Sequence, residues 1–257
     1  MVTSLRHFVG RRAWGAASTT TIVVAVMLLS APHIALDPGG PPAVAVVEPP
    51  TVGDERPIDI PPTAVSSMPP AAAVPADLVD PALDLRAGPV AVPIALELPS
   101  IGVHADVLGV GLGANDIMDA PTGGADDPVW GQAFWYRGSA VPGAASTALI
   151  AGHIGSRYGP GIFARLDEMV PGDPIVVQDL RTGLGTRFVV TETTEYSLEE
   201  AARPEVLDRI YGAGPVAGMH PQPSTDGLSH LTLITCAGTF RGDTHDHRRV
   251  VSAVAQP

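Results

Sequence analysis

The sequence predicts an all-β domain, a barrel or a sandwich, in the C-terminal two thirds of the chain. Short runs rich in Val, Ile, Leu and Thr alternate with Gly, Pro and Asp, which is typical of strands joined by turns. Few stretches have the 3.6-residue period of a long helix. The predicted strands cover residues 94–97, 102–110, 145–151, 174–179, 186–194, 231–236 and 250–255.

Residues 1–36 have the pattern of a membrane-targeting segment. Arg6, Arg11 and Arg12 precede residues 13–36, which contain no Asp, Glu, Lys or Arg. About 20 apolar helical residues span the ~30 Å hydrocarbon core of a bilayer. Because the positive charge lies on the N-terminal side, we expect the N-terminus inside and the remainder outside.

A cleaved signal peptide has the same charged start and apolar middle. Small residues at Ser30, Ala31 and Ala35 permit cleavage, but Pro32 directly after Ala31 disfavours it there. We therefore favour an uncleaved anchor. The chain is then a single-pass protein of the cell membrane with an extracellular C-terminal domain.

Residues 37–90 are predicted to be a disordered, Pro/Ala-rich tether. Thirteen of the 27 prolines lie there. Proline fixes φ and lacks an N–H donor, so neither a helix nor a central strand is expected. Residues 91–257 then form one domain that is long enough for a single core.

Two short helices are predicted between the strands at 186–194 and 231–236. Ser197 and Glu200 fit a capping box, and Pro204 with Gly212 marks a helix over residues 204–211. A third helix is expected over residues 163–169. The connection 197–230 is the longest without strand character, so it is a candidate wall of a binding site.

Three chemically active side chains lie near the ends of apolar runs. Cys236, the only cysteine, ends the run 231–236, and His153 follows the run 148–152. Arg248 and Arg249 open a third run. A thiol nucleophile, an imidazole acid/base and a guanidinium that stabilises an oxyanion together indicate cysteine acyl transfer on a peptide. The structural alternatives are a packed thiol, a strand-end histidine and solvated arginines.

The position of the thiol within its strand favours reactivity. Ala237 and Gly238 follow Cys236 at once, so we expect the strand to stop there and the thiol to lie at an edge. Arg248 and Arg249 cannot point the same way, because side chains alternate along a strand. One of them should face the site.

Composition and motifs exclude several other functions. The net charge of −12 makes a nucleic-acid partner unfavourable. The cluster of Asp243, His245, Asp246 and His247 suggests a metal site, but such a turn is more often a solvated hairpin, and we expect no metal. A Gly-x-Ser-x-Gly motif is absent from the sequence, so a serine triad is unsupported.

At these residues the chain resembles a sortase. Residues 232–236, Thr-Leu-Ile-Thr-Cys, resemble the TLxTC signature of that family, and Arg248 lies where the arginine of the family is expected. Residues 148–153 resemble the segment that carries the histidine. Further stretches resemble the actinobacterial class F branch, and the resemblance spans 92–255. These stretches are residues 98–103, 135–138, 142–143, 161–166 and 171–173.

The resemblance implies a closed eight-stranded β-barrel with a few short helices. It implies transpeptidation at an LPXTG-like sorting signal, with Cys236 as the nucleophile that forms a thioester. His153 is then the acid/base, and Arg248 stabilises the oxyanion, although the adjacent Arg249 leaves that choice open. Beside them, Thr235, Ala151 and Gly152 are expected to bind the substrate. No metal or organic cofactor is implied.

The implied partners are secreted proteins with a C-terminal sorting signal. The acceptor is the amine of a peptidoglycan stem peptide or of its lipid-linked precursor, and we expect a monomer. One alternative is an exported, non-catalytic β-barrel binding module in which Cys236 is packed. Another is an L,D-transpeptidase, but that family has a Ser-His-Gly-Cys run, whereas Ser229 and His230 lie six or more residues before Cys236.

Overall fold

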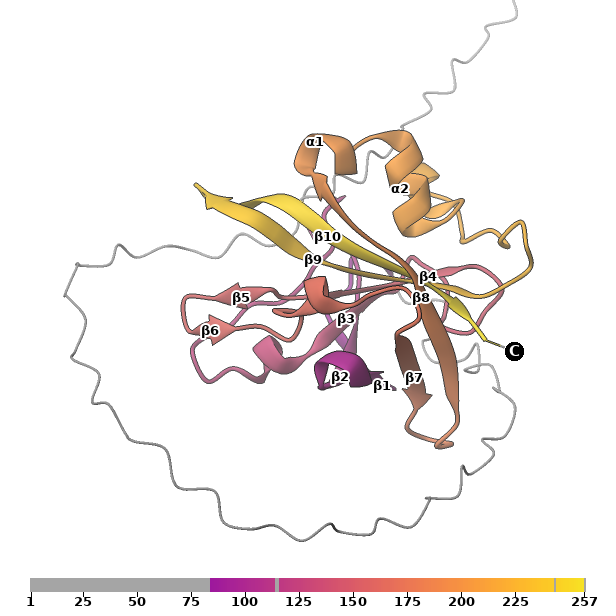
Figure 1. Cartoon of the computed structure of the whole chain (residues 1–257), viewed down its shortest axis with the longest axis horizontal. Coiled ribbons are helices and arrows are strands. Elements are labelled where there is room, and N and C mark those ends of the chain that lie inside the picture. Colours follow the sequence, from indigo (N-terminus) through magenta and orange to yellow (C-terminus); the bar gives the residue numbers. More distant parts are fainter. Residues whose placement is uncertain (1–83, 114–115, 243, 257) are drawn as a thin grey trace, which may run out of the picture.

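The computed structural model describes residues 84–113, 116–242 and 244–256. In this part of the chain eight strands close into a barrel in the order β1-β2-β3-β4-β9-β10-β8-β7 (Figure 1). This confirms the closed barrel. The predicted membrane segment and residues 37–83 of the predicted tether lie outside the described residues. Within the described residues, no helix has the length and apolar character needed to cross a membrane.

The strands are mostly antiparallel, but β2 pairs with β3 and β4 pairs with β9 in parallel. The barrel strands are β1 (Val90–Leu98), β2 (Val103–Val110), β3 (Ala133–Tyr136), β4 (Thr147–Gly152), β7 (Pro174–Asp179), β8 (Gly185–Ser197), β9 (His230–Arg241) and β10 (Thr244–Ala255). A small separate hairpin is formed by β5 (Gly155–Ser156) and β6 (Gly159–Pro160).

The predicted caps of the two helices between β8 and β9 are confirmed. Ser197 and Glu200 form both bonds of a capping box at the start of α1 (Leu198–Ala201). Proline begins α2 (Pro204–Tyr211), and Gly212 ends it with φ 72°, a left-handed value that glycine adopts without strain. Figure 1 shows both helices together on one side of the barrel.

The helix predicted over residues 163–169 is wrong. The segment holds only a 3₁₀ turn, Leu166–Glu168. Phe163, Leu166 and Met169 are all buried, and a spacing of three matches the 3.0 residues per turn of a 3₁₀ helix. Packing of these three side chains against the barrel core decides the local geometry.

The predicted end of the strand at Cys236 is also wrong, because β9 continues to Arg241. The register between β9 and β10 shifts between His245 and His247. Two residues of β9, Gly238 and Thr239, thus face the single residue Asp246 of β10. Gly238 has φ 75°, and a Cβ there would lie 2.3 Å from an oxygen of Asp246. The glycine therefore accommodates a β-bulge and does not terminate the strand.

Two hydrophobic clusters lie on opposite faces of the sheet. The first fills the barrel and includes Leu231, Leu233 and Val251. The second lies outside the barrel, where Ile234 and Val250 pack against residues of α1, α2 and the segment between β2 and β3. Because side chains alternate along each strand, the even-numbered residues of β9 before Gly238, and those of β10 from Arg248 onward, lie on the outer face.

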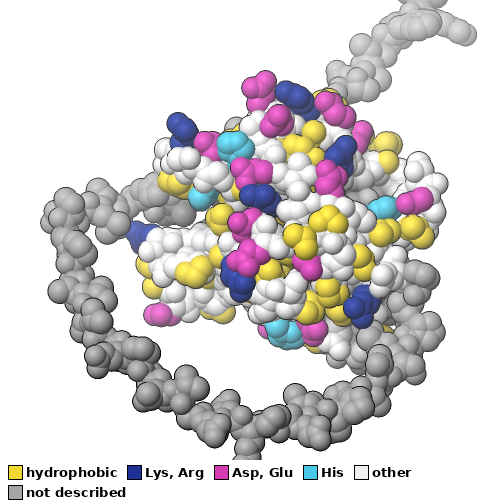
Figure 2. Space-filling model, in the orientation of Figure 1, with side chains coloured by type: hydrophobic (Ala, Val, Ile, Leu, Met, Phe, Trp, Pro, Cys, Tyr) yellow, Lys and Arg dark blue, Asp and Glu magenta, His cyan; other side chains and the backbone are white. Residues whose placement is uncertain are grey.

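Charges are mixed on the face of the described residues that Figure 2 presents. Acidic and basic side chains alternate there and do not gather into a patch of one sign. Such a surface lacks the basic stripe that binds nucleic acid.

Candidate active site

The register of three neighbouring strands brings the predicted catalytic residues together. Cys236 of β9 is the direct partner of Arg248 in β10. On the other side of β9, Ala151 of β4 pairs with Ile234. Two residues further along each of these parallel strands, His153 on the β4 side lies level with Cys236 of β9. Adjacent strands lie about 5 Å apart, so thiol and imidazole come from adjacent backbones.

The thiol of Cys236 is buried, and its side chain is 2% exposed. Burial raises the pKa of the thiol, and the positive charge of Arg248 opposes this only in part. A thiol in this setting is protonated at neutral pH, because the thiolate is the charged form that burial disfavours.

The imidazole of His153 is equally buried, with 2% exposure. Its Nε2 lies 2.9 Å from the carbonyl oxygen of Pro121. The rings of Trp130 and Phe134 lie against it, with centroids 4.8 and 5.2 Å away. Burial lowers the pKa of His153, and the hydrogen bond to Pro121 opposes this in part.

The two adjacent arginines point to different surroundings. Arg248 is fully buried, and its Nη1 donates to the carbonyl oxygens of His245 and His247 at 3.0 and 2.7 Å. Arg249 instead pairs with Glu195. The alternation that the sequence predicted is therefore present, and Arg248 is the one opposite the thiol. Burial lowers the pKa of Arg248, yet a guanidinium stays charged in proteins.

The residues predicted to bind substrate lie on β9 and β4, one or two positions before the thiol and the imidazole. The hydroxyl of Thr235 donates to the carbonyl oxygen of Gly152 at 2.7 Å. This bond joins the residue before Cys236 to the residue before His153. Ala151 and Thr235 are both buried, and a Cβ on Gly152 would lie 2.5 Å from the ring of Phe163. The lack of a side chain at Gly152 therefore lets Phe163 approach the backbone closely.

This arrangement can supply acyl-transfer chemistry. A neutral thiol and a neutral imidazole can exchange one proton to give a thiolate and an imidazolium, and the buried guanidinium stabilises negative charge nearby. Such groups with shifted pKa values are typical of functional sites.

The metal site suggested by the hairpin between β9 and β10 has another explanation. Asp246 accepts from the backbone of Thr239 and from Arg241, both at 2.8 Å, and it pairs with His247 at 2.7 Å. Asp243 lies outside the described residues. In the described part of the chain, no group of three or more His, Cys, Asp or Glu could hold a metal.

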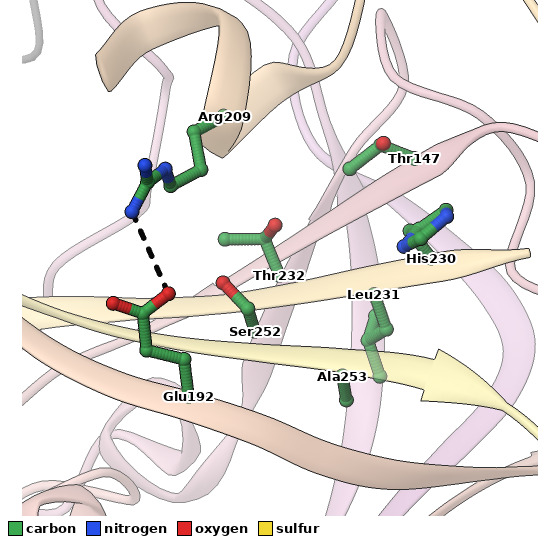
Figure 3. A pocket seen from close by; sticks show the side chains of 8 residues that line it. All are labelled: Thr147, Glu192, Arg209, His230, Leu231, Thr232, Ser252 and Ala253. Atoms are coloured by element: carbon green, nitrogen blue, oxygen red, sulfur yellow. Dashed lines mark hydrogen bonds and ion pairs between the residues drawn. The ribbon is translucent and has the colours of Figure 1, made fainter. Parts of the chain in front are cut away.

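Two cavities lie near this ladder. One of about 150 Å³ opens beside Cys236 and is also lined by Asp167, Glu195 and Arg249. A larger one of about 200 Å³ lies farther along the strands, between Arg209 of α2 and the hydroxyls of Thr232 and Ser252 (Figure 3).

The larger cavity is separate from the thiol. Thr232 pairs with Ser252, and along β9 this pair lies four residues before the pair of Cys236 and Arg248. Four residues of strand span about 13 Å. The smaller cavity is therefore the one that belongs to the site.

Sequence reasoning missed Pro121 and Trp130. Both lie between β2 and β3, far from His153 in the chain. The only local signal is Asp127-Pro128, which indicates a turn. Asp127 does cap the 3₁₀ turn Pro128–Gly131, but a turn does not reveal its tertiary neighbour.

A sequence profile of the family described as Sortase domain matches residues 96–256. This chain belongs to the sortase family. No curated protein sequence matches it. Among solved structures, sortase A from Corynebacterium diphtheriae is 20% identical with a TM-score of 0.44, over 67% of this chain and 63% of that chain.

Two further solved sortases are similar in the same way. Sortase C-1 from Actinomyces oris is 19% identical with a TM-score of 0.43, over 64% of this chain and 73% of that chain. A Clostridium perfringens sortase D5 transpeptidase is 18% identical with a TM-score of 0.41, over 64% and 78%. This sortase chain thus spans less than two thirds of the Corynebacterium sortase.

Replacing Thr235 by valine should destabilise the sortase barrel beside the site. The substitution removes a buried hydroxyl and leaves the carbonyl of Gly152 without that donor, which costs about 1–3 kcal/mol in the free energy of unfolding. Urea unfolding of the Thr235→Val variant measures the loss.

Thr186→Val is the matched control. The buried hydroxyl of Thr186 has no hydrogen-bond partner among the residues that the structure describes, so its removal should leave stability unchanged or higher. Equal losses in the two variants would show that the bond between Thr235 and Gly152 contributes nothing.

Proposed function

We propose that this sortase is a cysteine transpeptidase that cleaves an LPXTG-like sorting signal between Thr and Gly. It transfers the secreted protein to a cell-wall amine, on a peptidoglycan stem peptide or its lipid-linked precursor. The similarity of its motifs to the actinobacterial class F branch supports placing it in that class. Residues 1–36 anchor it in the membrane, and the Pro/Ala-rich residues from 37 up to the start of the barrel tether the catalytic domain outside the cell.

One observation carries this proposal: Cys236 pairs directly with Arg248, and the other neighbour of its strand, β4, ends one residue before His153. A nucleophile, an oxyanion donor and an acid/base then act on one carbonyl. Full burial of a guanidinium is costly. Its place opposite the thiol gives that charge a catalytic use.

The first half of the reaction forms the acyl-enzyme. The Sγ of Cys236 attacks the carbonyl carbon of the threonine and forms a C–S bond, while Arg248 stabilises the negative oxygen. His153 gives its proton to the glycine nitrogen, and the C–N bond breaks. The glycine-containing fragment leaves, and a thioester remains.

The second half reverses these roles. The acceptor amine attacks the thioester and gives a proton to His153. The new C–N bond forms as the C–S bond breaks, and Cys236 is regenerated. Neither half requires a metal or an organic cofactor.

The geometry argues against an L,D-transpeptidase that would use His230. That residue begins β9, six positions before Cys236, and its Nε2 bonds Asp226 at 3.0 Å. An adhesion or binding module with a packed Cys236 remains the other outcome of the tests below.

Catalytic variants of the full chain test the proposal on a quenched LPXTG peptide. Cys236→Ala should abolish cleavage, because no other thiol exists in the chain. Arg248→Ala should lower kcat/KM by about 10²–10³, and Arg248→Lys should recover only part, because lysine lacks the planar fork. Circular dichroism checks that each variant is folded.

Arg249→Ala is the comparison variant, because Arg249 lines the cavity beside Cys236 but pairs with Glu195 and is not the strand partner of the thiol. A larger loss from Arg249→Ala than from Arg248→Ala would reverse their roles. Wild-type turnover by Cys236→Ala would reject the nucleophile and favour a non-catalytic module.

The pH dependence of kcat/KM should be a broad plateau. Burial lowers the pKa of His153 and raises that of Cys236 from their ordinary values. The singly protonated pair dominates between the two shifted pKa values, and its thiolate–imidazolium form is a constant minor fraction. Activity falls below the pKa of His153, where both groups are protonated, and above that of Cys236, where both are deprotonated. A steady rise through pH 9 with no plateau would contradict this account.

A further inference from the structure

The imidazole of His153 has one nitrogen already engaged. Its Nε2 lies 2.9 Å from the carbonyl oxygen of Pro121. A carbonyl oxygen can only accept a hydrogen bond, so Nε2 must carry a hydrogen. In the neutral ring, the lone pair is then on Nδ1.

Trp130 is bonded to the segment that follows Pro121. The indole Nε1 of Trp130 donates to the carbonyl oxygen of Gly124 at 2.7 Å, three residues after Pro121. The backbone oxygen of Trp130 accepts a hydrogen bond from the N–H of Ile162 at 2.9 Å. This bond fixes Trp130 to the segment that follows His153. The indole ring also lies 4.8 Å from the imidazole, centroid to centroid.

We propose that Trp130 is a positioning residue of the sortase reaction. It holds the Pro121 carbonyl on Nε2 of His153, which keeps a hydrogen on that nitrogen and makes Nδ1 the atom that exchanges protons during catalysis. The catalytic part rests on the proposed function, whereas the placement of the hydrogen does not.

The assignment balances the protons of the reaction. The imidazolium carries hydrogens on both nitrogens, and the one on Nδ1 goes to the departing glycine nitrogen as its C–N bond breaks. The ring is then neutral with Nε2–H still bonded to Pro121. Nδ1 takes a proton from the incoming amine, and the imidazolium that the next cycle needs is restored.

A backbone carbonyl suits this task. It orients the ring as a side-chain partner does in other acid/base sites, but it does not titrate. The aromatic neighbours Trp130 and Phe134 are also uncharged. The tautomer is therefore fixed by an uncharged group and not by a carboxylate next to the buried imidazole.

The variant Trp130→Phe tests the proposal in the full chain. It keeps an aromatic ring beside His153 but removes the N–H that holds Gly124. Trp135→Phe is the matched control, because it likewise removes an indole bond to a backbone oxygen, that of Ala140 at 2.9 Å, but it lies in the barrel interior.

Histidine ¹⁵N NMR at about pH 8, above the ordinary histidine pKa, gives the tautomer directly. Wild type and Trp135→Phe should show His153 with the hydrogen on Nε2, and Trp130→Phe should show a mixture. Loss of one hydrogen bond corresponds to about a 3- to 10-fold fall in kcat for Trp130→Phe, with KM nearly unchanged. Trp135→Phe should keep kcat.

Three results would overturn the proposal. One is a wild-type hydrogen on Nδ1, and another is an unchanged tautomer and kcat in Trp130→Phe. The third is a rise in kcat in Trp130→Phe, which would mean that the contact of Trp130 with His153 blocks access to the site. If the tautomer changes as expected while wild type cleaves no sorting-signal peptide, the proposed function fails and the hydrogen placement stands.

Discussion

Strand register is the constraint on which the site depends. Along β9, Leu231 and Leu233 point into the barrel, whereas Ile234 and Cys236 belong to the outer face. A slip of one residue exchanges these faces. It would bury the thiol among the barrel side chains and separate it from Arg248. The interior packing that stabilises the barrel therefore also fixes the catalytic geometry, and the bond from Thr235 to Gly152 fixes the register between β9 and β4.

Burial sets the resting electrostatics of the site. Cys236, His153 and Arg248 are all 2% exposed or less, and burial disfavours the charged form of each. The thiol and the imidazole can avoid this cost by staying neutral, whereas the guanidinium cannot. Arg248 is accordingly bonded to two backbone carbonyls. The fold thus keeps one permanent charge beside the thiol that, in the proposed reaction, is ionised through proton exchange with His153.

The sequence predicts the parts of the fold that local chemistry decides. The runs that became β7, β9 and β10 are rich in β-branched residues, and the capping box at Ser197 and the proline at 204 begin helices where expected. β3 was missed because its four residues are all buried and show no alternation. Gly238 was interpreted as a strand end because a glycine at a bulge and a glycine at a turn look the same in sequence.

In the site too, local sequence predicts some residues and only the tertiary structure reveals the others. Cys236, His153 and Arg248 were predicted from strand ends and from resemblance, and the ladder brings their strands together. The choice between Arg248 and Arg249 needed the register, since only the partner strand shows which arginine faces the thiol. Pro121 and Trp130 needed tertiary structure, because the contact with His153 joins segments with no shared local pattern.

The central claim is that strand register brings the sulfur of Cys236 within bonding reach of the His153 ring. Dibromoacetone tests this directly, because its short carbon bridge joins a thiol and an imidazole only when they are adjacent. After treatment of the folded full chain and proteolysis, mass spectrometry should find the peptide of Cys236 linked to that of His153. A bridge from Cys236 to His245 or His247, or a thiol modified only after unfolding, would contradict the account.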